Sequence, residues 1–428
     1  MVYKQDIKIN IYSGKVLGRA EQRLIMKKYI FNFFRKLEIY EDLHNSKGYK
    51  KDLTIAISKF IDIGDEESAY GVYTAFFKAY WIGVQESDNP FLELTKTIKK
   101  YEECAGRLID NQRDHYIHSV NVFLLGIAIF SANEKYRKYF DDYALDKKIY
   151  PDSYNTKNEE FFYRWGLAAL FHDIGYPIEI TLKQANKYFN FIWCYPKKVK
   201  CKKSSFVKIP HFDKFIKLPS LKASMKYRTE FFLKYPRNKI ADKNDSVSLL
   251  AEYIAPRLGI SSGNMKKRMR FFIGKMEKDG FVDHGFYGAV IMARWYYHLL
   301  KATKWNPAYF YYPVLDSATA ILLHNFYKHV LMKKPFNLRL LRAYQHPIAY
   351  LLIICDEIQD WNRKAYGEND NPSIEKDIKL IVNNNGLRLL YKGKRAKNSS
   401  VKISKTFVVN ECDIFKKGIR IVKGGKHG

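Results

Sequence analysis

The hydrophobic positions of this chain recur mainly at the three- and four-residue spacing of amphipathic helices. Between about residues 18 and 110 they form two stripes, namely Leu24, Tyr29, Ile30, Phe33 and Phe34, and then Tyr70, Tyr73, Phe76, Phe77 and Tyr80. The same spacing predicts helices over 111–133 and 160–173, and it returns over 246–302, 314–331 and 336–364. We therefore expect a mainly α-helical protein.

Polar and Pro/Gly-containing segments divide the helical pattern into regions. Residues 62–68, which include Gly64, predict a helix–helix connection, and Gly175 with Pro177 predicts the end of the helix before them. The Lys-rich, Pro-punctuated stretch over about 190–245 predicts an insertion of loop or short strands. We expect an N-terminal helical region over 1–109, a catalytic domain over 110–365 and a small β-rich element over 366–428, where β-branched residues alternate around Asn385-Gly386.

Charge narrows the classes of partner. The chain has 428 residues, 47% of them hydrophobic, and a formal net charge of +30 with an isoelectric point near 9.6. This charge indicates a polyanionic partner, such as a nucleotide, a nucleic acid or an anionic membrane, unless it only reflects a Lys-rich source proteome. The five cysteines form no CxxC pair, and no signal peptide or membrane-spanning run is visible, so we expect a cytoplasmic protein without a membrane partner.

Histidine and aspartate stand repeatedly at deep or terminal positions of helices that are expected to be buried. They are His118 in RDHYIHSVNV, His172-Asp173 in LAALFHDIGYP, His284 in FVDHGFYGAV, His324 in ATAILLHN and Asp356 in AYLLIICDEIQDW. A carboxylate that closes an apolar run is costly to bury unless it is paired or bound to a metal. Inward-facing imidazoles and carboxylates in a helical bundle can bind one or two divalent ions, and Asp173 could bridge two of them.

Other polar residues near these motifs have two readings. A single histidine on an apolar helix is more often a hydrogen-bonded core residue, which is how we interpret His298, His329 and His346. His115 precedes His118 by nearly one turn and Asp360 follows Asp356 by one turn, so each could orient a metal ligand or simply face solvent. The same alternatives hold for Asp114 and Asp283.

The order H…HD…D resembles the HD superfamily of metal-dependent phosphohydrolases over residues 110–362. The segments HSVNV, HDIGYP and CDEIQDW carry the likeness. It implies an all-helical catalytic bundle in which a first metal is held by His118, His172, Asp173 and Asp356. His284 and His324 fall where dinuclear members, such as HD-GYP phosphodiesterases and CRISPR-associated HD nucleases, place ligands of a second metal. Tyr176 and His115 depart from the subfamilies we compared, so none is matched.

The resemblance also implies an activity. It points to hydrolysis of a phosphoester or phosphoanhydride bond in a nucleotide or deoxynucleotide by a metal-bound hydroxide, with His172, Asp173 and Asp356 as catalytic residues. The divalent ion is Mn, Fe, Mg, Zn or Co, which the ligand types do not distinguish. Basic residues close to the motifs in sequence are candidates for phosphate binding, namely Arg113, Arg164, Lys328 and Arg363.

Two other functions are compatible with the same residues. One is a phosphodiesterase or nuclease for single-stranded nucleic acid or cyclic oligonucleotides, which a lysine strip in the insertion would track beside Phe206: Lys197, Lys198, Lys200, Lys202, Lys203 and Lys208. The other is a nucleotide sensor without turnover. A role in nucleotide signalling or antiviral defence fits these readings, and the sequence leaves the oligomeric state open.

Overall fold

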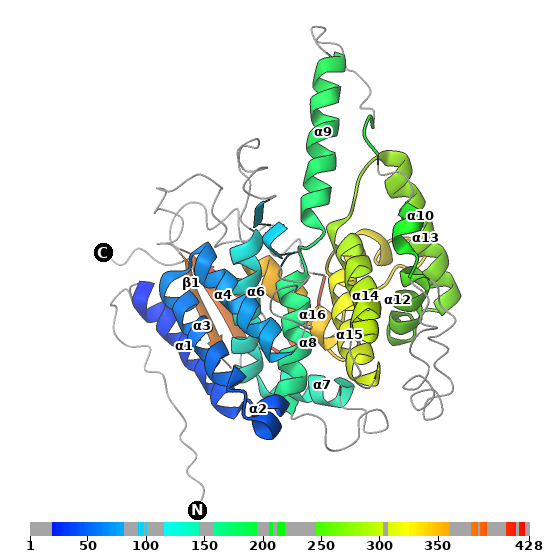
Figure 1. The fold of residues 1–428 in the computed structure, drawn as a ribbon. Helices are drawn as coiled ribbons and strands as arrows, with labels where there is room; N and C mark the ends of the chain where they lie inside the picture. The colour runs from blue at the N-terminus through cyan, green and yellow to red at the C-terminus, as the bar shows by residue number, and fades with distance from the viewer. Residues whose placement is uncertain are drawn as a thin grey trace, which may run out of the picture.

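A computed structural model describes residues 19–80, 93, 95–97, 99–100, 115–144, 157–194, 205–208, 212–218, 245–302, 307–359, 378–383, 386–391, 408–416 and 419–423. These residues are mainly helical, as the hydrophobic spacing predicts (Figure 1). The proposed division into 1–109, 110–365 and 366–428 remains a prediction.

The N-terminal helices are joined by short connections with clear local signals. They are α1 (Arg19–Lys36), α2 (Tyr40–Asn45), α3 (Tyr49–Ile63) and α4 (Glu66–Ala79). Helix α3 ends at Gly64, whose φ of 72° is in the left-handed region that glycine adopts without a steric cost. Asp65 then caps α4 by accepting a hydrogen bond from Ser68 N at 2.8 Å. The predicted connection over 62–68 is therefore confirmed.

The central helices surround the predicted His and Asp motifs. They are α6 (His115–Ala132), α7 (Glu134–Ala144), α8 (Lys157–Phe171), α9 (Tyr176–Cys194), α10 (Phe212–Ile216), α12 (Ser246–Ile254), α13 (Ser262–Asp279), α14 (His284–Ala302), α15 (Pro307–Phe326) and α16 (Pro347–Gln359). A short 3-10 helix, Pro256–Leu258, follows α12, and a π-helical segment, Tyr327–Leu331, continues α15.

Helix α9 departs from the sequence-based expectation. Helix α8 ends at Phe171 as expected, but Pro177 lies in the first turn of a new 19-residue helix and does not begin a loop. Proline is tolerated there because the first backbone N–H groups of a helix have no partner within it. Residues 190–194 thus belong to α9. Of the expected insertion, the described part comprises 205–208 and 212–218.

Helix α6 is the one described helix that is long and apolar enough to cross a membrane. It spans 18 residues, and 83% of that window is buried inside the protein. Such burial is that of a core helix and is compatible with a soluble protein.

One hydrophobic core joins the N-terminal helices to the central ones. It extends from Ile30 to Phe415 in the chain. Aromatic rings make much of the contact, since the ring of Phe33 in α1 lies 5.8 Å from that of Phe130 in α6 and 6.0 Å from that of Phe161 in α8. The N-terminal helices therefore help to hold α6 and α8 in place.

Helices α8 and α15 run side by side in the same direction and in a fixed register. Arg164 in α8 pairs with Asp316 in α15, 152 residues later, with 2.5 Å between Nη1 and Oδ2. Eight residues further along each helix, and so at the same offset, His172 and His324 have ring centroids 5.7 Å apart. The buried ion pair thus lies about two turns below the histidine pair.

A polar network surrounds this ion pair. Arg164 also donates to Glu160 at 2.9 Å, and Asp316 accepts hydrogen bonds from Tyr143 at 2.6 Å and Tyr253 at 3.0 Å. Burial alone would raise the pKa of Asp316, but Arg164, His346, Arg257 and the hydrogen bond from Tyr143 together outweigh it and lower the pKa to about 2. Both members of the pair are therefore charged and hydrogen-bonded.

The C-terminal region contributes one small sheet. Strands β1 (Ile378–Asn383) and β2 (Gly386–Tyr391) pair antiparallel, and β3 (Ile419–Lys423) pairs parallel to β2. Residues 408–416 are not part of this sheet, and there Asn410 N donates to Leu341 O at 2.9 Å. The described part of 366–428 thus comprises a three-stranded sheet and the short 3-10 helix Glu411–Asp413, and the β-rich element as a whole remains a prediction.

Removal of Arg164 should destabilise the protein far more than removal of an exposed arginine. We expect Arg164→Ala to lower the free energy of unfolding by about 3–5 kcal/mol because it leaves Asp316 buried with less compensation. The matched control is Arg270→Ala, which breaks the 3.2 Å pair with Asp245 at a side chain 48% exposed and should cost about 0–1 kcal/mol. Equal losses in urea denaturation would contradict the structural role of the pair.

Glu159 in α8 should make stability fall as pH rises. It is 2% exposed and accepts a hydrogen bond from Tyr40 N, and burial raises its pKa from 4.5 to about 8. Between pH 4.5 and pH 8 the folded state therefore keeps a proton on Glu159 that the unfolded state has released. The contribution of this proton to the free energy of unfolding is lost as pH rises toward 8. We expect Glu159→Gln to remove a slope of up to about 1.4 kcal/mol per pH unit. In unfolding measurements, the free energy of unfolding of the variant relative to that of the parent protein should be higher at pH 9 than at pH 5.

Candidate metal centre

The six residues expected to ligate metal come together in the structure as two neighbouring clusters. The first consists of His118, His172 and Asp356, and the second of Asp173, His284 and His324. Within each cluster, one potential ligand atom per residue lies within 4.8 Å of the others. Each cluster could hold a metal ion.

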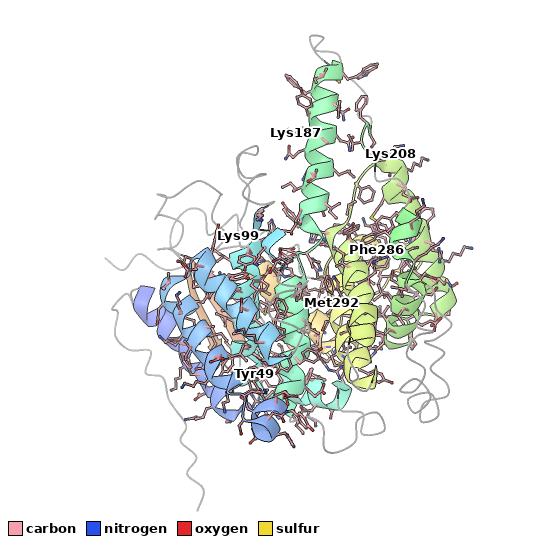
Figure 2. The ribbon with its side chains drawn as sticks, in the orientation of Figure 1. Tyr49, Lys99, Lys187, Lys208, Phe286 and Met292 are labelled. Carbon is pink, nitrogen blue, oxygen red and sulfur yellow. The ribbon has the colours of Figure 1, made fainter. Side chains whose placement is uncertain are left out.

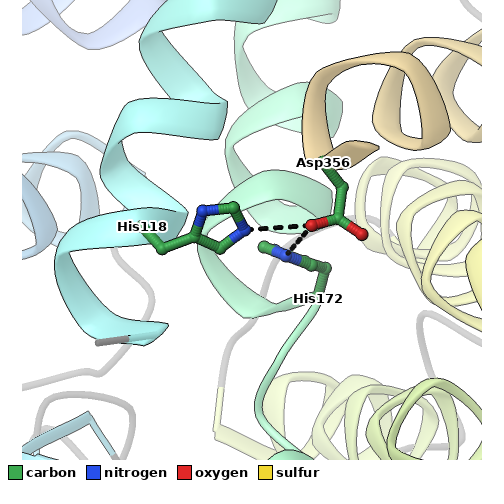
Figure 3. Close-up of side chains that lie close together, drawn as sticks. All are labelled: His118, His172 and Asp356. Atoms are coloured by element: carbon green, nitrogen blue, oxygen red, sulfur yellow. Dashed lines mark hydrogen bonds and ion pairs between the residues drawn. The ribbon is translucent and has the colours of Figure 1, made fainter. Parts of the chain in front are cut away.

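The first cluster is formed by α6, the end of α8 and α16 (Figure 3). Nε2 of His118 lies 3.0 Å from Oδ1 of Asp356, and Nε2 of His172 lies 3.7 Å from the same oxygen. His118 is 4% exposed and His172 is fully buried. Two buried imidazoles thus face one carboxylate whose side chain is 25% exposed, so the cluster lies between the core and the solvent.

The second cluster lies between the turn after α8 and the helices α14 and α15. Nε2 of His284 lies 3.4 Å from Oδ1 of Asp173 and 3.0 Å from Nε2 of His324. The two imidazoles therefore direct their Nε2 atoms at each other, and the carboxylate completes the group.

Asp173 connects the clusters because its two oxygens face different partners. Oδ1 faces His284, while Oδ2 lies 3.3 Å from Nε2 of His172 in the first cluster. Oδ2 also accepts a hydrogen bond of 2.8 Å from Nδ1 of His115. A carboxylate placed in this way can bridge two ions, and His115 fixes its orientation from behind.

The end of α8 strengthens the attraction for cations. His172 and Asp173 directly follow Phe171, the last residue of this helix. The carbonyl groups at a helix C-terminus carry partial negative charge, which favours a nearby cation. The C-terminus of α8 therefore adds to the field of the carboxylates.

The hydrogen bonds of the histidines leave Nε2 available for a ligand role. Nδ1 of His172 bonds to Ala169 O at 2.9 Å, and Nδ1 of His324 bonds to Ile321 O. Nδ1 of each ring must carry the proton because a carbonyl oxygen only accepts, so in the neutral imidazole Nε2 has a free lone pair. Nε2 of His172 is buried and makes no hydrogen bond within the described part of the chain. This nitrogen is therefore suited to coordinate a divalent metal ion.

The carboxylates also shift the pKa values of the imidazoles. Burial opposes protonation of His172, but Asp173 and Asp356 outweigh it and raise the pKa to about 10. For His284, Glu179 and Asp173 likewise outweigh burial and raise the pKa to about 9. His324 differs, because burial and the two neighbouring histidines lower its pKa to about 4. The clusters thus favour positive charge, which a bound cation would supply.

Two glycines allow the helices to approach closely enough to form the clusters. A Cβ atom at Gly175 would collide with the carbonyl oxygen of His284. At Gly285, a Cβ would lie 2.8 Å from the ring of His324 and 2.8 Å from Ile321 O. The turn after α8 can therefore contact the start of α14, and α14 can contact α15, because these positions carry no side chain.

Glu179 belongs to the site although the sequence patterns did not single it out. It lies in the first turn of α9, and its Oε2 accepts hydrogen bonds from Nδ1 of His284 at 2.7 Å and from His284 N at 2.9 Å. This carboxylate fixes the ring of His284 with Nε2 toward the cluster. Its only sequence signal is an acidic residue seven positions after His172. Asn325 was also missed, and its side-chain nitrogen lies 3.1 Å from Nε2 of His284.

Asp283 has a local structural function. Its Oδ1 accepts a hydrogen bond from Phe286 N at 2.8 Å, which caps α14 immediately before His284. Burial raises the pKa of Asp283 to about 6. His346 is fully buried and bonds to Thr319 at 2.8 Å, so the core interpretation of this histidine is confirmed.

The residues expected to bind phosphate lie in different settings. Arg164 is buried in the ion pair with Asp316, which corrects the expectation that it contacts substrate. Lys328 is half-buried in the π-helical segment that follows His324. The other two candidates, Arg113 and Arg363, lie outside the described residues, as do Asp114 and Asp360, for which a role in orienting a metal ligand was considered. The side chain of His298 is also outside the described part.

Comparisons with protein-family models, curated proteins and solved structures gave no significant match. The helical fold and its His/Asp clusters are compatible with an HD-type fold.

Glu179→Gln should weaken metal binding at the second cluster. The amide can still accept a hydrogen bond from His284 but loses the negative charge that supports the ring, so we expect a loss of about 10–100-fold in affinity. Titration with Mn²⁺ or Zn²⁺ by calorimetry, together with metal content per chain, measures this change. Glu134→Gln is the control, at an exposed acid in the first turn of α7. Unchanged affinity in Glu179→Gln would show that Glu179 does not support a metal ligand.

Proposed function

We propose that this protein is a metal-dependent phosphohydrolase that acts on a phosphoester or phosphoanhydride bond of a nucleotide. The observation that carries the proposal is the pair of His/Asp clusters joined by the two oxygens of Asp173. Divalent ions held there would lower the pKa of a shared water and neutralise phosphate oxygens, which is the chemistry that such hydrolysis requires.

The side chains of the site have separable tasks in this proposal. His118, His172 and Asp356 would hold one ion, His284 and His324 the other, and Asp173 both. His115 would keep Asp173 in its bridging orientation through the 2.8 Å hydrogen bond. Glu179 would hold the ring of His284. The ligands sit on rigid helices or directly at their ends, so the site needs little reorganisation when substrate binds.

A cationic group beside the second cluster supports a phosphate-bearing substrate. Burial and the charges of Lys328 and Lys333 lower the pKa of His329, which is also affected by Glu179 and His284 of the site. His329 is thus within electrostatic reach both of these lysines and of the residues Glu179 and His284 at the second cluster. In the proposal, Lys328 binds phosphate oxygens that extend beyond the ions.

The sequence motifs add a second line of support. The segments around His118, His172-Asp173 and Asp356 resemble those of HD phosphohydrolases, and the residues concerned meet in one place although 238 positions separate His118 from Asp356. The resemblance in sequence and the spatial meeting of these residues are separate observations, and both support the proposal.

Asp173→Asn is the sharpest test of the proposal. The variant removes the negative charge that faces both clusters but keeps an oxygen able to accept from His115, so the fold should be retained. We expect hydrolysis to fall by at least about 100-fold, because even residues behind metal ligands cost 10–100-fold when changed. The exposed Asp279→Asn is the matched control.

The assay is a metal-supplemented screen of nucleoside triphosphates, cyclic nucleotides and single-stranded oligonucleotides, with products identified. A nucleotide substrate should show weak salt dependence, whereas a polymer should show a steep loss of affinity as counterions compete. Preferential cleavage of polymers would replace the nucleotide by a nucleic acid. Activity that persists in Asp173→Asn, or metal binding without turnover of any substrate, would reject the proposed enzyme.

A further inference from the structure

Helix α9 stands out from the rest of the protein (Figure 1). It begins at Tyr176 beside the metal centre and runs without a break to Cys194, so its far end forms a tip. Asn186 joins this helix to the neighbouring segment 205–208 through its side-chain bonds to Val207 N and Val207 O, at 2.8 and 2.9 Å. The tip is therefore a defined part of the structure and includes Phe206.

Large apolar side chains are exposed at this tip. Of the twelve exposed large hydrophobic residues in the described part of the chain, six lie here: Tyr188 (62%), Phe189 (43%), Phe191 (66%), Ile192 (51%), Trp193 (68%) and Phe206 (43%). The other six are distributed over distant parts of the chain. Single exposed apolar residues are ordinary on protein surfaces, but a group of this kind marks an interaction site.

The chain at the tip is basic. Between residues 180 and 212 the sequence contains no aspartate or glutamate and eight lysines, of which Lys183, Lys187 and Lys208 belong to the described part of the chain. Lys183 and Lys187 are exposed one turn apart on α9. Lys208 is exposed on the adjoining segment, and Figure 2 shows it and Lys187. A partner must therefore provide an apolar region that can bury the exposed side chains, and negative charge beside it.

An anionic lipid surface satisfies both requirements. Aromatic and aliphatic side chains enter the boundary between headgroups and acyl chains, while lysines contact the anionic headgroups. A second copy of the same tip would bring the lysines of α9 together, and this helix has no acidic residue beyond Glu179 to offset them. Single-stranded nucleic acid would need separate rings for base stacking. Here the ring of Phe206 instead packs near those of Phe189 and Trp193, at 5.9 and 6.1 Å between centroids.

We propose that the tip formed by residues 188–193 of α9 and Phe206 inserts into the interface of anionic membranes and anchors the protein peripherally. This departs from the expectation of no membrane partner, which rested on the lack of a spanning segment. Fourteen residues separate Glu179 from Trp193 on α9, so the helix would hold the metal centre roughly 20 Å from the inserted tip. The anchoring does not depend on the proposed hydrolase activity.

The test is flotation of the full chain with vesicles. We expect binding to vesicles of phosphatidylcholine mixed with phosphatidylglycerol, little binding to phosphatidylcholine alone, and weaker binding at high salt. The double variant Phe191→Ser/Trp193→Ser should bind anionic vesicles at least about tenfold more weakly, since it removes two large apolar groups from the tip.

The matched control is Phe271→Ser/Tyr344→Ser, which changes two aromatic residues of similar exposure, 61% and 58%, away from the tip. It should bind vesicles like the parent protein. Metal content should be the same in all three proteins, so a failure of anchoring is distinguishable from a failure of the metal centre.

Two results would overturn the proposal. One is equal vesicle binding by the tip variant and the control. The other is a lack of vesicle binding by the parent protein. In that case, self-association on sizing chromatography and affinity for a single-stranded oligonucleotide would be compared between the parent protein and the tip variant, and either could be lost in the variant. Those last two effects would assign the tip to a second copy of the chain or to nucleic acid.

Discussion

The ion pair between Arg164 and Asp316 is the constraint on which the geometry of the site depends. It fixes α8 against α15 at one register, and the same offset brings His172 beside His324 two turns later. A helix can slide only in steps that exchange its side-chain contacts, and each such step would separate these charges in a dry interior. A purely apolar interface would accept neighbouring registers at a smaller cost. The buried charges therefore specify how α8 and α15 align, and this alignment positions His172 and His324.

The sequence predicted the helical class, the connection over 62–68 and the residues that meet in the clusters because each depends on local pattern. Apolar spacing marks a helix, and an acid or imidazole ending an apolar run marks a polar group in a buried place. It did not predict Glu179, whose partner His284 lies 105 residues away, nor the burial of Arg164, because neither has a periodic signature. Helix α9 was not predicted, because Pro177 correctly marks the end of α8 but also lies in the first turn of the next helix.

Charge is distributed in opposite senses inside and outside the molecule. The chain as a whole carries +30, yet the centre gathers the carboxylates of Asp173, Asp356 and Glu179 with the C-terminus of α8. Such an interior attracts cations, and the outer field attracts anions. A phosphate compound would be drawn by the long-range field and then be held by ions that the short-range field retains. The same outer field, concentrated in the acid-free stretch 180–212, also suits an anionic surface.

Gly175 has a consequence for how the chain tolerates change over evolution. Every possible replacement adds at least one carbon atom, and that atom would meet the backbone carbonyl of His284. A side chain in the way could adopt another rotamer, but main chain at the start of a helix has no such alternative. The position contributes no ligand, no charge and no hydrogen-bonding side chain, and yet it admits no other amino acid without displacing α14. Substitutions at position 175 are therefore expected to be eliminated by selection, although the glycine takes no direct part in the site.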